Sequence, residues 1–73
     1  MSEIEEMKNS MVSELAMILM EKDKHLSLEQ ALSTVINSDT YQKLLDDRTR
    51  LYLQSPGYVF SFLEHELKTG KVG

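Results

Sequence analysis

The segment from Met11 to Met20 is strongly apolar, with eight apolar residues in ten. Only Ser13 and Glu14 interrupt it. A helix that is apolar around most of its circumference has to be covered on several sides, either by other elements of the chain or by a second copy. The segment therefore predicts the centre of a small helical domain or the seam of a dimer.

The chain has 73 residues, which predicts one domain with one core. A domain this small buries only about 60–65% of the surface that its unfolded chain exposes, so many such domains gain stability from disulfides, metals or oligomerisation. The sequence has no cysteine and two widely separated histidines, which excludes disulfides and does not favour a structural metal site. Self-association is the remaining source of stability, and we expect a homodimer.

The formal net charge of −4 makes nucleic acid an unlikely partner, because nonspecific binding to phosphates relies on Lys and Arg. The apolar segment is about half the roughly 20 residues needed to span a bilayer. The chain also starts with acidic residues, whereas a secretory signal starts with basic ones. We therefore expect a cytoplasmic protein with no membrane segment.

Local signals mark where helices begin. Ser27 and Gln30 have the spacing of a capping box, and Ser55 precedes Pro56 as an N-cap precedes proline at the first helical position. Gly70 follows the last periodic residues, as expected of a helix stop. The predicted helices span residues 3–22, 28–37, 39–46 and 56–68, and a frayed tail follows at 70–73.

The segment 48–54 is the part with the weakest helical pattern. Leu51 and Leu53 alternate with polar or aromatic residues, over too few residues to predict a strand. We interpret it as an extended connector, with a two-stranded ribbon across a dimer as the alternative. The expected fold class is therefore an all-α domain of three or four helices with a short extended connector, in a dimer.

The first predicted helix carries the candidates for self-association. Its apolar residues recur at three- and four-residue spacing, and its methionines offer flexible side chains that adapt to irregular surfaces. The alternative is that they fill the domain's own core. The candidates are Met7, Met11, Leu15, Ile18 and Leu19.

No residue cluster predicts catalysis, a cofactor or a metal. His65 lies between two glutamates, but neighbours on a helix point in different directions. Asp46 and Asp47 are expected to form a turn with Arg48 or Thr49. The three glycines form no phosphate-binding loop. We expect a protein that is not an enzyme and has no cofactor.

Arg48, Arg50, Tyr52 and Tyr58 are the candidates for binding a partner, because Arg and Tyr dominate interaction hot spots. The alternative is that the arginines pair with nearby acids while the tyrosines pack at the rim of the core. The favoured function is a non-enzymatic protein–protein interaction module.

Two other functions stay open. Residues 27–45 could form a helix-turn-helix of a DNA-binding regulator, although Lys43 is the one basic residue on its second helix. Arg48, Arg50 and Tyr52 could instead bind a small ligand, which would require a pocket around them.

The run from Ser38 to Phe60, with the preceding Ser-Leu-Glu-Gln-Ala-Leu at 27–32, resembles short helical bacterial proteins known only as domains of unknown function. The resemblance covers about the last two thirds of the chain. Some such proteins are encoded beside toxin-like enzymes, including ADP-ribosyltransferase-like ones. The resemblance implies an antitoxin-like or regulatory accessory role and carries over no functional residue.

Overall fold

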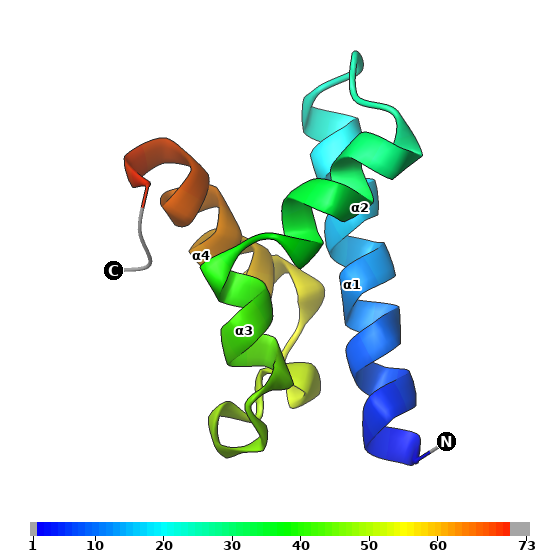
Figure 1. The fold of residues 1–73 in the computed structure, drawn as a ribbon, viewed down its shortest axis with the longest axis vertical. Helices are drawn as coiled ribbons and strands as arrows, with labels where there is room; N and C mark the ends of the chain where they lie inside the picture. Colours follow the sequence, from blue (N-terminus) through cyan, green and yellow to red (C-terminus); the bar gives the residue numbers. More distant parts are fainter. Residues whose placement is uncertain (1, 71–73) are drawn as a thin grey trace.

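The computed structural model describes residues 2–70 as an all-α domain (Figure 1). Within this range the fold has four α-helices and two 3-10 turns, which are joined by short connections. Each helix begins and ends within one residue of its predicted bounds. The elements are α1 (Glu3–Lys22), α2 (Leu28–Ile36), α3 (Asp39–Leu45), η1 (Asp47–Thr49), η2 (Leu51–Leu53) and α4 (Pro56–Thr69).

A serine begins every α-helix. In each case its hydroxyl accepts a hydrogen bond from the backbone N–H three residues later, which satisfies one of the donors left free at a helix start. Gln30 completes the predicted capping box by accepting from the Ser27 N–H. Gly70 ends α4 in the left-handed conformation, with φ of 82°. The serines are Ser2, Ser27, Ser38 and Ser55.

The apolar segment of α1 lies at the centre of the domain. α2 runs back along the C-terminal half of α1, and α4 also packs against α1, while α3 packs against α4 (Figure 1). The chain therefore covers its own apolar helix on several sides. The buried apolar residues are Met11, Leu15, Ala16, Leu19, Ala31, Val35, Leu44, Leu51, Val59, Phe60 and Leu63.

This packing corrects part of the self-association prediction. Leu15 is fully buried, and Met11 and Leu19 are 4% and 7% exposed within the single chain. The wide apolar surface that suggested a dimer seam is thus covered by α2 and α4. Ile18 is half-buried against the same core, and Met7, at 36% exposure, is the candidate that most clearly reaches the surface.

The predicted extended connector is also wrong. Residues 47–53 form the two 3-10 turns, with Arg50 between them in the left-handed region at φ of 52°. Leu51 is buried in the core whereas Leu53 is exposed. The two leucines therefore differ in burial because they lie in a tight turn against α1. The predicted tail lies outside the described residues beyond Gly70. Within residues 2–70, no helix is both long and apolar enough to cross a bilayer.

Candidate functional site

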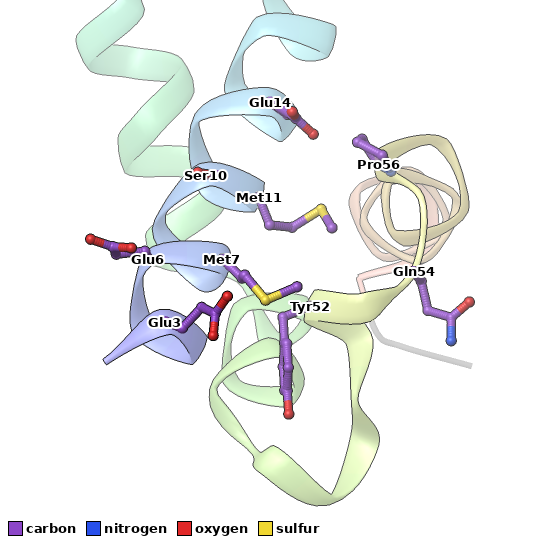
Figure 2. Close-up of a pocket in the computed structure, with 9 residues that line it drawn as sticks. All are labelled: Glu3, Glu6, Met7, Ser10, Met11, Glu14, Tyr52, Gln54 and Pro56. Atoms are coloured by element: carbon purple, nitrogen blue, oxygen red, sulfur yellow. The ribbon is translucent and has the colours of Figure 1, made fainter. Parts of the chain in front are cut away.

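An open groove of about 290 Å³ lies between the N-terminal half of α1 and the segment that links η2 to α4 (Figure 2). One wall comes from residues 3–14 and the other from residues 52–56, so the two walls are far apart in sequence. The groove therefore exists only when η2 and α4 are folded against α1. The lining residues are Glu3, Glu6, Met7, Ser10, Met11, Glu14, Tyr52, Gln54 and Pro56.

The floor of the groove is apolar. Figure 2 shows the side chains of Met7 and Met11 extending from α1 toward the opposite wall, where Tyr52 and Pro56 lie. Met11 belongs to the buried core, so the floor is continuous with the interior of the domain. Methionine is flexible and polarisable, and surfaces built from it adapt to partner side chains of different shapes.

The rim of the groove on α1 is acidic. Glu3 and Glu14 lie at opposite ends of the methionine pair, while Glu6 points away from the opposite wall (Figure 2). None of these three carboxylates makes a hydrogen bond or ion pair with another of residues 2–70, and no basic residue lines the groove. Their negative charge thus faces solvent beside an apolar floor.

Lys8 does not line the groove but contacts one of its lining residues, Tyr52. Its ammonium donates to the Leu45 carbonyl at 2.9 Å and to the Asp47 carboxylate, and it lies 5.7 Å from the centre of the Tyr52 ring. The side chain is only 13% exposed. Lys8 therefore ties the end of α3 and the η1 turn to α1, and it positions the ring that forms one wall.

The groove offers several polar groups for binding. Among residues 2–70, the polar side chains that line it are three carboxylates, the hydroxyls of Ser10 and Tyr52 and the Gln54 amide, and no histidine or lysine is among them. Across the described part of the chain, no cluster of three or more His, Cys, Asp or Glu could hold a metal ion.

The four predicted partner-binding residues do not come together as one surface in the groove. Only Tyr52 lines it. The Arg48 guanidinium makes two hydrogen bonds with the Asp46 carboxylate, at 3.0 and 2.9 Å, which is the pairing weighed as the alternative. This hydrogen-bonded arginine lowers the pKa of Asp46 to about 2. Tyr58 is half exposed and packs edge-to-face on Phe62, with ring centres 5.2 Å apart.

Arg50 has a conformational role. It is the only non-glycine residue among the described ones with a positive φ, and its side chain makes no hydrogen bond or ion pair with residues 2–70. Of the three residues of the predicted small-ligand site, Tyr52 lines the groove, whereas Arg48 and Arg50 do not.

Glu66 of α4 forms a second carboxylate site, which the sequence did not reveal. Its oxygens accept from the Asp39 N–H at 2.7 Å, the Thr40 N–H at 2.9 Å and the Thr40 hydroxyl at 2.8 Å. Burial acts to raise the pKa of Glu66, but these hydrogen bonds outweigh it and lower the pKa. The Glu66 carboxylate thus binds the N-terminus of α3. In a helix-turn-helix protein, this end of the second helix would contact DNA.

Three of the missed residues, Lys8, Glu3 and Glu14, left signals in the sequence. Lys8 comes three residues before Met11 and seven before Leu15, so helical spacing places it on the same face as these core residues. Glu3 and Met7 share a face for the same reason, as do Met7, Met11 and Glu14. Nothing in the sequence indicates which part of the chain lies opposite that face.

Comparison with known proteins adds no family to these observations. No protein family, curated protein or solved structure matches this chain. The resemblance of residues 27–60 to short bacterial proteins of unknown function therefore stays a prediction.

Proposed function

We propose that this protein is a non-enzymatic interaction module that binds another polypeptide in the groove between α1 and the η2–α4 segment. The observation that carries the proposal is a groove floor made of Met7, 36% exposed, and the nearly buried Met11, with carboxylates beside it that no donor among residues 2–70 binds. Binding sites are commonly concave and combine apolar side chains with a few polar groups, as this groove does.

The size of the groove favours a polypeptide over a small molecule. Its volume of about 290 Å³ is at the lower limit of small-molecule pockets, which range from about 300 to 1,000 Å³ and enclose most of the ligand. A shallow groove of this size accommodates one or two side chains of a larger partner, as in helix-in-groove recognition. An antitoxin-like or regulatory accessory role would use this kind of contact.

Self-association is a weaker candidate for this groove. A two-fold dimer through the groove would place the same patch of both copies in contact, so the acidic rim of one copy would lie close to the acidic rim of the other. Three of the five residues predicted to form a dimer are already buried within the single chain. The homodimer expected from the sequence therefore has less support than binding of a different partner.

The test compares two exposed methionines on α1. Met7 lines the groove, whereas Met17, 59% exposed, lies on α1 outside it. Tagged wild-type protein, Met7→Ala and Met17→Ala would each be used to capture partners from lysate of the native cells. We expect a stoichiometric second protein with the wild type and with Met17→Ala, and a clear loss with Met7→Ala. Equal recovery by all three proteins would overturn the proposal.

A further inference from the structure

We infer that the segment bound in the groove is basic and amphipathic, with apolar side chains on the methionine floor and Lys or Arg beside the carboxylates of Glu3 and Glu14. This inference rests on the proposed function and adds the chemistry of the partner. Its first support is charge: three carboxylates line the groove, and among residues 2–70 no basic side chain lines it and no donor binds these carboxylates.

The apolar floor determines what else the partner must carry. Met7 and Met11 lie between the two carboxylates, so a purely cationic ligand would leave the floor uncovered. A purely apolar segment would cover it but would bring no charge to the rim. Both parts of the groove are used together only by a segment with apolar and basic side chains on the same face.

The spacing on α1 gives the length of the segment. Glu3 and Glu14 are eleven positions apart in one helix, which corresponds to about 16 Å along its axis. A helical partner would span this distance with basic residues about eleven positions apart, and an extended one with residues about five apart. A small cationic metabolite is too short to reach both carboxylates and cover the methionines.

α1 also carries exposed glutamates that lie outside the groove and can serve as controls. Glu5 and Glu21 are exposed on the same helix as Glu3 and Glu14, but they do not line the groove. A double reversal of either pair to lysine changes the net charge equally, and each removes one carboxylate from the first turn of α1. The two double variants therefore separate a local charge effect from a general one.

The probes are three peptides of about 18 residues, each about 27 Å long when helical. The first has leucine at helical spacing with lysine at the other positions. The second replaces every lysine by glutamate, and the third replaces every leucine by serine. Binding would be followed by the NMR signals of the methionine methyl groups and by titration calorimetry, with circular dichroism to verify that each protein variant is folded.

We expect the leucine–lysine peptide to shift the signals of Met7 and Met11 and to leave that of Met17 in place. Glu3→Lys/Glu14→Lys should raise its Kd about tenfold or more, while Glu5→Lys/Glu21→Lys should change it less than about threefold. Raising the ionic strength from about 0.1 to 1 M should weaken binding, because the Debye length falls from about 10 to 3 Å.

Equal binding of the leucine–glutamate or the serine–lysine peptide would overturn the inference, as would equal losses in the two double reversals. If lysate capture still depends on Met7 while the leucine–lysine peptide leaves its signal unchanged, the interaction module stands and its basic partner is wrong. If capture does not distinguish Met7→Ala from Met17→Ala, the proposed function itself fails.

Discussion

Two regions of the molecule place glutamates beside packed apolar residues, with opposite results. At the junction of α3 and α4, the Glu66 carboxylate accepts three hydrogen bonds and has a lowered pKa. At the groove, the carboxylates of Glu3 and Glu14 receive no hydrogen bond from residues 2–70. The first carboxylate has a structural partner, and the others are available to an external one.

In a small domain, the hydrogen-bond partners of a carboxylate indicate whether its charge serves folding or binding. A carboxylate that is partly buried has to be satisfied, because an unpaired buried charge costs several kcal/mol. Glu66 meets that requirement within the chain. Glu3 and Glu14 are exposed and impose no such requirement, so their substitution should affect binding and leave folding almost unchanged.

The largest expected effect on stability is at the closed junction. Leu63→Ala empties a fully buried position of α4, and we expect a loss of about 2–5 kcal/mol in the free energy of unfolding. A domain of this size has little more than that in total, so urea denaturation should begin near zero denaturant. Leu67→Ala, one turn later at a half-exposed position, is the control and should lose less than about 1 kcal/mol.

One substitution in each region tests whether Glu66 stabilises the fold while Glu14 does not. Glu66→Gln keeps the shape but replaces one acceptor oxygen by an NH2 group, which removes at least one of the three hydrogen bonds to α3. It should lower the free energy of unfolding by about 1–3 kcal/mol in urea denaturation at neutral pH. Glu14→Gln should change stability by less than about 0.5 kcal/mol. A similar cost for both would show that the two carboxylates do not differ as described.

The pH dependence of stability should also show the structural role of Glu66. Because folding lowers the pKa of Glu66 from the ordinary value of 4.5, its contribution is complete above that pH and is lost as the pH falls through the lowered value. Thermal unfolding should therefore show a larger loss between about pH 5 and 3 for the wild type than for Glu66→Gln. Parallel curves would contradict this role.

A smaller loss of stability is expected when the contacts of Lys8 are removed. Lys8→Met removes the hydrogen bonds to the Leu45 carbonyl and Asp47 while keeping the aliphatic stem, and should cost about 0.5–1.5 kcal/mol. Its control is Lys24→Met at an exposed position, with an effect below about 0.5 kcal/mol. The Tyr52 NMR signals should also shift in Lys8→Met alone. Unchanged signals would mean that Lys8 does not position the ring.

The helices were predictable because their signals are local. The capping box at Ser27 and the Ser55-Pro56 pair satisfy backbone groups only a few residues away, so sequence spacing alone identifies them. Four helices cover the described chain, and the all-α class is correct. The two 3-10 turns escaped prediction because the short alternation at Leu51 and Leu53 fits several conformations.

The groove could not be predicted because it depends on contacts between distant parts of the chain. Met7 and Met11 were both chosen from the sequence for their apolar spacing, and only the fold shows that Met7 is 36% exposed while Met11 is 4% exposed. Glu66 is 26 positions from Thr40, and no local pattern links them. Arg48 was chosen as a hot-spot residue and instead pairs with Asp46 two residues away.

We propose that the methionine groove binds a basic segment of a different polypeptide. The most direct measurement is photocrosslinking in the native cells, with a photoreactive residue placed at position 7 or, as the matched control, at position 17. We expect position 7 to crosslink to a second protein through a segment rich in Lys or Arg, and position 17 not to do so. Crosslinks from position 7 to another copy of this chain, or equal crosslinking from both positions, would contradict it.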